Sequence, residues 1–275
     1  MKIKRVFSLF LGVTLLSLSS CFKIDNWDAP GSTMSGTVYD VYTGAPLLAS
    51  QNDWQIRIWE RSYSRIEGGA TDFQNLRIKQ DGTYQNTKLF DGTYDMLPYN
   101  GPYWPMDTIK NVVLKGSHTE NFTVRPYLQI VDFTPELNGV NLTLKFKVKA
   151  PLLRNEEIDP PMNLPNLYDV RFWISFNPFC GNGADSNIGW DDWHHLNNNG
   201  RWEPRQNINN LISATAERNP RRIPGPGNGV DTTGEFELGP VALRPGYKYY
   251  IRVGANVDRG DRAFNYSDIR EIDLR

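Results

Sequence analysis

The stretch Asp81-Gly-Thr-Tyr-Gln-Asn-Thr-Lys-Leu-Phe-Asp-Gly-Thr-Tyr94 decides the fold. It places an Asp-Gly pair on each side of a strand-like run at residues 83–90, and Asp-Gly is a strong signal for a tight hairpin turn. Leu76-Arg-Ile-Lys79 is a short strand that ends at the first pair, and Thr93-Tyr-Asp-Met-Leu97 follows the second. Short strands between tight turns predict an all-β sandwich.

The same pattern extends to both sides of this stretch. In residues 54–61 the side chains alternate, so that Trp54, Ile56 and Ile58 share one face of a strand. Further strands are expected within residues 34–47, 108–115 and 121–127, which makes a set of about seven. We therefore predict a first β-sandwich domain over residues 34–125.

The second half of the chain predicts another β-sandwich domain, over residues 126–275. Residues 140–149 and 168–176 are its clearest strands, and residues 126–133 and 135–139 are expected to be a bridge and a turn. The predicted inward faces of the two strands are Val140, Leu142, Leu144, Phe146 and Val148, and Tyr168, Val170, Phe172, Ile174 and Phe176.

Two segments of this second half break the strand pattern. Residues 154–166 are rich in proline and predict an irregular excursion. Residues 177–234 form a long insert, and long ordered loops are usually functional or disordered. Within the insert, residues 206–218 fit either a short helix or a strand from Leu211.

Two motifs resemble known folds. Ser35-Gly-Thr-Val-Tyr-Asp40 with Thr43-Gly-Ala-Pro-Leu47 resembles the transthyretin-like, carboxypeptidase-regulatory-like fold. Leu243-Arg-Pro-Gly-Tyr-Lys-Tyr249 resembles strands E and F of a fibronectin type III domain, which has an immunoglobulin-like sandwich. That resemblance implies that Tyr249 is a tyrosine corner, whose hydroxyl bonds the backbone where the chain turns.

Residues 81–94 also look like the hallmark of an uncharacterised family of two-domain Bacteroidetes lipoproteins. The resemblance covers most of the chain after the signal segment and is strongest over residues 34–128. Members are often encoded beside the transporter and glycan-binding lipoprotein of starch-utilisation-type systems. The resemblance therefore implies a setting in glycan uptake, with those two proteins as neighbours, and it carries over no catalytic residue.

The N-terminus predicts a lipid anchor. A basic start and an apolar run at residues 6–18 precede two serines, as in a secretory signal peptide. Leu18-Ser-Ser-Cys21 resembles the bacterial lipobox, which implies cleavage after residue 20 and lipid on Cys21. The apolar run is shorter than the roughly 20 residues of a membrane span. We expect a signal peptide at 1–20, a lipidated tether at 21–33, and a lipid-anchored protein on the outer-membrane surface.

Composition excludes several function classes. Removing residues 1–20 leaves 255 residues and takes away three positive charges, so the net charge changes from −1 to −4. Without a basic patch we expect no nucleic-acid partner. The chain has two cysteines. With Cys21 lipidated, Cys180 has no partner within the chain and is predicted to be a buried small residue.

Motifs for catalysis and cofactors are missing from the sequence. It has no Gly-x-Ser-x-Gly elbow, no phosphate loop and no dinucleotide fingerprint. His194 and His195 lack a second His cluster or a Cys pair that would complete a zinc site. We therefore expect neither enzyme activity nor a cofactor or metal. A calcium ion near residues 182–191 stays open, although solvated turn residues explain that stretch better.

Aromatic residues outside the strand pattern are the ligand-binding candidates. Flat rings stack on the C–H face of a sugar, while carboxylate, amide and guanidinium groups bond its hydroxyls. The insert supplies Trp190, Asp191, Asp192, Trp193, His194, Arg201 and Trp202, and a loop in the first domain supplies Tyr103 and Trp104. The structural alternative is that these rings only pin long loops onto the sandwiches.

The sequence thus favours a non-catalytic accessory protein of glycan capture. The alternative is a structural or protein-interaction module that docks to a transporter complex or to a neighbouring surface protein. An exposed row of Trp side chains would favour sugar binding, whereas a large apolar surface patch would favour the interaction module.

Overall fold

The computed structural model describes residues 29–51, 53–62, 72–165, 167–184, 187–188, 232 and 235–275. These residues form strands and connections, and Gly31–Arg275 make up one compact unit. No helix in the described part of the chain is long and apolar enough to cross a membrane. The fold is an all-β sandwich architecture with two hydrophobic cores.

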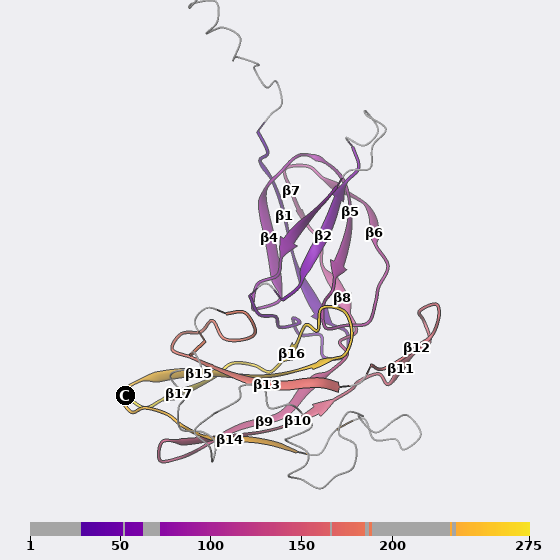
Figure 1. Ribbon diagram of the computed structural model, residues 1–275. Coiled ribbons are helices and arrows are strands. Elements are labelled where there is room, and N and C mark those ends of the chain that lie inside the picture. The colour runs from indigo at the N-terminus through magenta and orange to yellow at the C-terminus, as the bar shows by residue number, and fades with distance from the viewer. Residues whose placement is uncertain are drawn as a thin grey trace, which may run out of the picture. The chain divides into compact units, whose positions relative to one another are not determined.

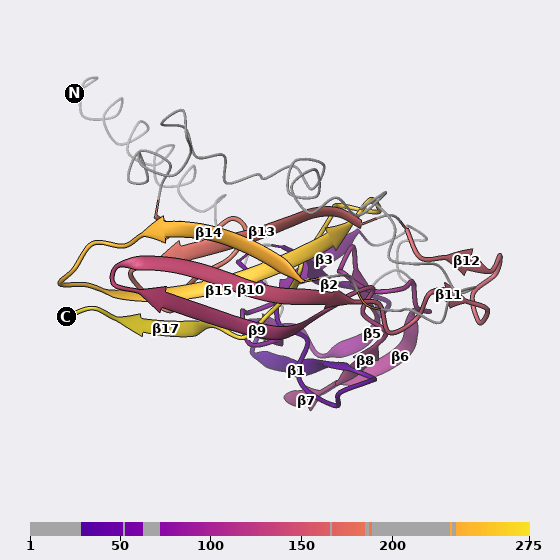
Figure 2. The same cartoon turned by 90° about the horizontal axis from the view of Figure 1, so that it is seen from below.

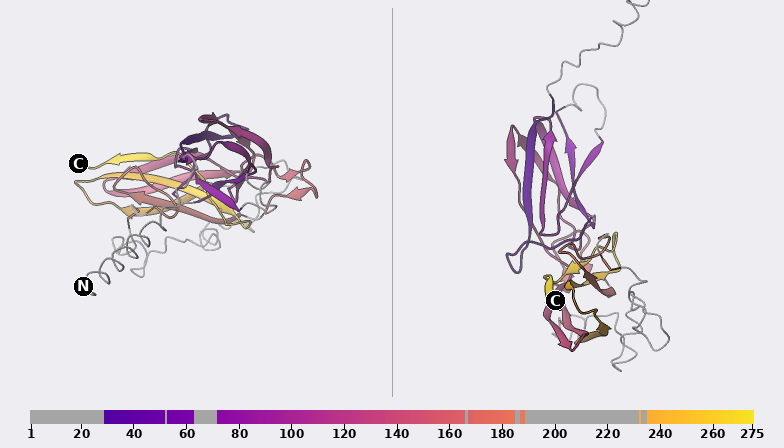
Figure 3. Two further views of the ribbon diagram at one scale, coloured as in Figure 1. Left: turned by 90° about the horizontal axis from the view of Figure 1, so that it is seen from above. Right: turned by 90° about the vertical axis from the view of Figure 1, so that its left-hand side faces the viewer.

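The first core lies between two sheets, which together form the N-terminal sandwich (Figure 1; Figure 3). One sheet has the order β4-β1-β7, with β8 also paired to β1, and the other has the order β3-β2-β5-β6. The strands are β1 (Ser32–Asp40), β2 (Gln55–Glu60), β3 (Phe73–Arg77), β4 (Thr83–Leu89), β5 (Gly92–Tyr99), β6 (Ile109–Leu114), β7 (Ser117–Thr119) and β8 (Phe122–Val124).

Alternation of side chains fills this core, as the sequence predicts. Trp54, Ile56 and Ile58 are all buried, and every second residue of β1 is buried as well. At Gly36 a Cβ would lie 1.8 Å from the backbone oxygen of Glu120. A glycine is required there, because β1 passes so close to the chain between β7 and β8.

The first Asp-Gly pair lies in the predicted tight turn, where the Gly82 N–H donates to the Lys79 carbonyl at 3.0 Å, and Asp91 directly precedes β5. Asp81 accepts hydrogen bonds from the N–H (3.0 Å) and hydroxyl (2.7 Å) of Thr83, and Gly82 has a φ of +79°. A single bridge, between Ile78 and Tyr84, follows this turn before β3 and β4 diverge into different sheets. The divergence lets both flanking strands bury side chains in one core from opposite sides.

The second core lies between the two sheets of the C-terminal sandwich, with orders β14-β10-β9 and β13-β15-β16; β17 also pairs with β15. Figure 2 shows β9, β10 and β14 side by side. The strands are β9 (Gln129–Asn138), β10 (Asn141–Lys149), β11 (Arg154–Asn155), β12 (Met162–Asn163), β13 (Leu167–Ser175), β14 (Phe236–Ala242), β15 (Lys248–Val257), β16 (Asn265–Tyr266) and β17 (Arg270–Asp273). The division into domains at residues 125 and 126 stays a prediction.

Strand β9 corrects the predicted bridge and turn at residues 126–139. It continues through Pro135 to Asn138, and the turn lies one step later, at Gly139 with a φ of +62°. Proline is tolerated because β9 is an edge strand, where a missing N–H breaks no ladder to a further strand. The proline-rich excursion likewise contains a short hairpin of β11 and β12.

The predicted inward face of residues 168–176 is only partly right. Val170, Phe172 and Ile174 are buried, whereas Tyr168 and Phe176 are 42% and 48% exposed. A register shift between Leu167 and Asp169 changes the facing of β13 at its start, so that Leu167 is buried in place of Tyr168. Phe176 lies just beyond the last residue of β13.

The tyrosine corner is confirmed. The Tyr249 ring is buried, and its hydroxyl donates to the Arg244 carbonyl at 2.9 Å and accepts from the Arg244 N–H at 3.0 Å. These two hydrogen bonds close the connection from β14 to β15, where Gly246 has a φ of +88°.

Replacing Tyr249 by Phe should therefore lower the free energy of unfolding by about 1–2 kcal/mol, because two backbone groups of Arg244 lose a buried partner. Urea unfolding followed by tryptophan fluorescence measures the change. Tyr247→Phe is the matched control, since Tyr247 is 49% exposed, and should change stability little. Equal stability of both variants would contradict the corner's role.

Candidate functional site

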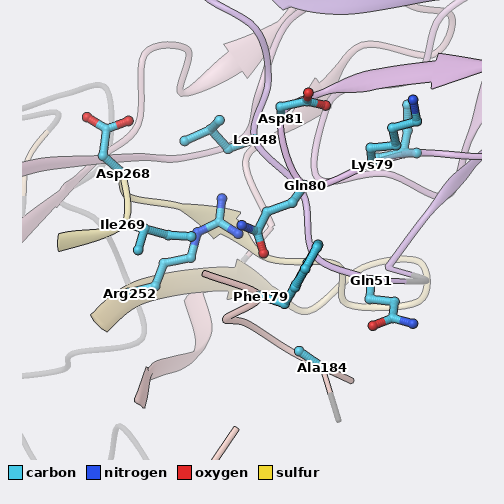
Figure 4. A pocket seen from close by; sticks show the side chains of 11 residues that line it. Leu48, Gln51, Lys79, Gln80, Asp81, Phe179, Ala184, Arg252, Asp268 and Ile269 are labelled. Atoms are coloured by element: carbon cyan, nitrogen blue, oxygen red, sulfur yellow. The ribbon is translucent and has the colours of Figure 1, made fainter. Parts of the chain in front are cut away.

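A cleft of about 770 Å³ lies where the two sandwiches meet (Figure 4). Its volume falls within the range typical of small-molecule sites. Loops of the N-terminal sandwich supply one side, and the chain after β13, strand β15 and the link from β16 to β17 supply the other. The lining residues are Leu48, Gln51, Ile78, Lys79, Gln80, Asp81, Phe179, Ala184, Arg252, Asp268 and Ile269.

Arg252 of β15 reaches the cleft from a buried position, with 1% of its surface exposed. Its Nε donates to the Ser267 carbonyl at 3.0 Å, and its Nη1 donates to the carbonyls of Ala49 at 2.5 Å and Cys180 at 3.3 Å. Its guanidinium carbon also lies 4.0 Å from the centre of the Tyr266 ring. Burial lowers the pKa of Arg252 to about 10, so the group stays charged at neutral pH.

The side chain of Gln80 holds the chain after β13 in place. Its Nε2 donates to the Pro178 carbonyl at 2.7 Å, and its Oε1 accepts from the Cys180 N–H at 3.1 Å. Phe179 lies between these two bonded residues, so a side chain of the N-terminal sandwich fixes its backbone. Figure 4 shows the Gln80 amide beside both Phe179 and the Arg252 guanidinium.

A half-buried residue, Asp53, reinforces the junction next to the cleft with its carboxylate. It accepts hydrogen bonds from the Tyr266 hydroxyl and from Nδ2 of Asn182 (3.2 Å). Burial raises the pKa of Asp53 to about 6, although these two hydrogen bonds oppose the shift. The raised pKa means that ionised Asp53 is held at an energetic cost near neutral pH.

The rim of the cleft is accessible and chemically mixed. The Phe179 ring is 62% exposed, and Lys79, Asp81 and Asp268 are exposed as well. These groups offer one aromatic face, an ammonium and two carboxylates, while Ile269 and Leu48 add apolar wall. The arrangement can bind a ligand with an apolar face and several hydroxyl groups.

The prediction for Cys180 is confirmed, because its side chain is buried and unpaired with another cysteine. Burial raises its pKa to about 12, so the thiol is protonated at neutral pH and is a poor nucleophile. The described residues contain no group of three or more His, Cys, Asp or Glu arranged to hold a metal.

The structure separates the sequence-predicted site residues into two sets. Tyr103 and Trp104 are described, and both rings are buried, at 5% and 1% exposure, so they offer no stacking surface to a ligand. Tyr103 packs edge-on against Trp54 and Trp104 packs against Tyr127. The loop-pinning interpretation is correct for these two. Cys21, Trp190, Asp191, Asp192, Trp193, His194, Arg201 and Trp202 lie outside the described residues.

The amides considered as calcium ligands have structural partners instead. Asn187 exchanges two hydrogen bonds with Gly181, and Asn182 bonds to Asp53. These contacts hold Gly181, Asn182 and Asn187 in place beside the cleft, while Asp185 and Asp191 lie outside the described residues.

Sequence reasoning missed the groups at the base of the cleft. Arg252 lies in β15, where residues 251–257 are all buried and the alternation of exposure stops. A lone arginine in such an apolar run signals a buried ionic contact, because charged side chains are rarely fully buried unless paired. Gln80 and Phe179 had no comparable signal, since both lie in loops.

The pH dependence of stability should reveal Asp53. Its pKa is raised from 3.8 to about 6 on folding. Its contribution to the stability of the fold is therefore fully present below pH 4 and is lost as the pH rises through about 6. In the wild type, Asp53 should lower the free energy of unfolding by up to about 3 kcal/mol between pH 4 and pH 7. We expect Asp53→Asn to lack this fall. Urea unfolding at several pH values measures it. Asp107→Asn, at an exposed site, should keep the wild-type slope; a wild-type slope in Asp53→Asn would contradict the assignment.

Comparisons with known proteins agree with this architecture. A crystal structure of a "putative carbohydrate binding protein" from Bacteroides uniformis has a TM-score of 0.60 at 20% identity, and the match covers 89% of this chain and all of that one. A DUF3823 family protein from the same species has a TM-score of 0.61 at 21% identity, covering 90% and 100%. One from Parabacteroides merdae has a TM-score of 0.51 at 19% identity, covering 89% and 100%.

These likenesses establish the shared fold across both sandwiches. A comparison with curated proteins gives no match. A family model covers the N-terminal sandwich: residues 32–125 match the N-terminal domain of a protein family of unknown function, DUF3823. Residues 32–125 are therefore similar to the DUF3823 N-terminal domain, and the chain shares its fold with proteins from Bacteroides.

Proposed function

We propose that this protein is a non-catalytic, carbohydrate-binding lipoprotein of the outer-membrane surface, and that the cleft beside Phe179 holds the sugar. The observation that carries the proposal is the 62% exposed Phe179 ring at a cleft rimmed by Lys79, Asp81 and Asp268. An exposed ring next to charged hydrogen-bonding groups suits a sugar, which has an apolar face and many hydroxyls.

The construction of the cleft supports a binding role. Ligands bind more tightly to groups that are already held in place, because less ordering is needed on binding. The backbone around Phe179 is held by Gln80, and Arg252 is held by three carbonyl oxygens. Carbohydrate binding is also the role named for the first of the two Bacteroides uniformis proteins that share this fold.

Lipid on Cys21 would place this cleft at a membrane surface. Each buried CH₂ of an acyl chain contributes about 0.8 kcal/mol, so several chains anchor a protein stably. Many copies on one membrane act together, so a weak single site is enough for capture. In this role the protein works beside a transporter and a glycan-binding lipoprotein.

An interaction module is the second candidate function. Phe176 and Tyr247 are 48% and 49% exposed, and their rings lie 5.2 Å apart beside the tyrosine corner. Adjacent exposed rings of this kind occur at protein interfaces. This patch favours docking to a neighbouring surface protein if no glycan binds.

The sugar site can be tested with a glycan panel, using calorimetry and affinity gels. For the glycans that bind, Phe179→Ala should weaken affinity about tenfold or more, which corresponds to about 1.4 kcal/mol, because the aromatic ring that the sugar would cover on binding is lost. Phe90→Ala is the control, since it removes an exposed ring outside the cleft lining and should leave affinity unchanged.

A third variant separates the cleft from the insert. If affinity survives Phe179→Ala but falls when Trp190, Trp193 and Trp202 are all replaced by Ala, the sugar site lies in the insert and the cleft assignment is wrong. If a cooperatively folded protein binds no glycan, carbohydrate binding is refuted and the interaction module is favoured.

Metabolic labelling with a radioactive fatty acid tests the anchor. The wild-type protein should incorporate label and remain in the membrane fraction. Cys21→Ala should lose both properties, because it removes the only sulfur that the lipobox presents for acylation. Cys180→Ala should label normally. Continued labelling of Cys21→Ala would refute the lipoprotein assignment.

A further inference from the structure

The outer face of the sheet β3-β2-β5-β6 carries a second set of aromatic and charged side chains. On β2 the buried side chains alternate with Gln55, Arg57 and Trp59, which point away from the core. Pairing across three strands brings Phe73 of β3 opposite Trp59, and Tyr99 of β5 opposite Gln55. Arg57 therefore lies diagonally between two aromatic rings.

The guanidinium of Arg57 is stacked between these two rings. Its central carbon lies 3.8 Å from the centre of the Phe73 ring and 3.5 Å from that of Tyr99. Trp59 packs edge-on against Phe73 and supports the stack from the side. Guanidinium–aromatic stacking of this kind holds the planar fork in one orientation.

The Arg57 fork has no anionic partner among the described residues. Its Nε is buried without a hydrogen-bond acceptor, and its terminal nitrogens form no hydrogen bond or ion pair with the described residues. The nearby carboxylate, Asp95, accepts instead from Nε of Arg61 at 2.8 Å. Arg77 lies on the same face opposite Gln55 and adds a second exposed cation.

We propose that this face is a subsite for the carboxylate groups of an acidic polysaccharide, with Arg57 as its central contact. The inference rests on the proposed glycan-binding function and names a class of ligand for it. A planar carboxylate accepts two parallel hydrogen bonds from a guanidinium fork, and the stack presents that fork already oriented. Arg77 would bind a second carboxylate farther along the polysaccharide.

The amount of exposed apolar surface favours a glycan over a protein partner. Stable protein interfaces bury about 800 Å² per partner around an apolar centre. On the described strands of this sheet, the exposed large hydrophobic residues are Phe73, at 40%, and Val113, at 63%. A face that carries aromatic rings and the cations Arg57 and Arg77 is better matched to an extended chain of acidic sugars.

The test measures binding of an oligomer of galacturonic acid and of the equivalent neutral galactose oligomer by calorimetry. Arg57→Gln should weaken binding of the acidic oligomer about tenfold or more, which corresponds to about 1.4 kcal/mol, and leave the neutral one unchanged. Arg57→Lys should recover only part of the loss, since lysine keeps the charge but not the fork. Lys88→Gln, on the opposite sheet, is the matched charge control and should have little effect.

Other outcomes would overturn the proposal. If panel glycans bind and depend on Phe179, but Arg57→Gln does not alter binding of the acidic oligomer, the inference fails and the proposed function stands. If no glycan binds a folded protein, both fail. If polyglutamate displaces the acidic oligomer at an equal carboxylate concentration, the face responds to charge alone and suits an acidic protein. Circular dichroism and thermal unfolding verify that each variant is folded.

Discussion

A buried guanidinium joins the two sandwiches. Arg252 belongs to the C-terminal sandwich, yet it donates to the carbonyl of Ala49 in the N-terminal sandwich as well as to those of Cys180 and Ser267. Leaving a buried charge without partners is strongly destabilising, typically by about 3–5 kcal/mol. The three carbonyls must therefore stay where Arg252 can reach them, and this requirement positions the loops that line the cleft.

The candidate sugar site follows from that constraint. Phe179 precedes Cys180, whose carbonyl bonds to Arg252 and whose N–H bonds to Gln80. The backbone beside the exposed ring is thus held from both sandwiches. Arg57 is also a guanidinium held in place by its neighbours, but on the surface of a sheet. The rings of Phe73 and Tyr99 stack on its two faces, and no described carboxylate neutralises it. One arginine organises the interior, and the other is the proposed contact for an acidic ligand.

The sequence predicted best those features that depend on local pattern. Alternation identified β1, β2 and β10 and their buried faces, and the spacing from Leu243 to Tyr249 identified the tyrosine corner. It could not show which sheet each strand joins after an Asp-Gly turn. It also could not show that Pro135 lies in an edge strand, because both depend on pairing between distant segments.

The candidate sites were harder to predict for the same reason. Tyr103 and Trp104 have the composition of a binding loop, but tertiary packing buries them. In the sequence, Arg57 is an ordinary outward-facing residue of an alternating strand. Its stacking on Phe73 and Tyr99 arises only when distant strands pair. The cleft joins residues more than 200 positions apart, from Leu48 to Asp268, which no local motif reports.

The cleft held together by Arg252 is the proposed sugar site. An NMR titration with the tightest-binding glycan of the panel tests it most directly, by following the Arg252 Nε–H and the Phe179 ring protons. We expect both signals to shift saturably, with the same dissociation constant that calorimetry gives for binding. Saturable binding with both signals unmoved would contradict it.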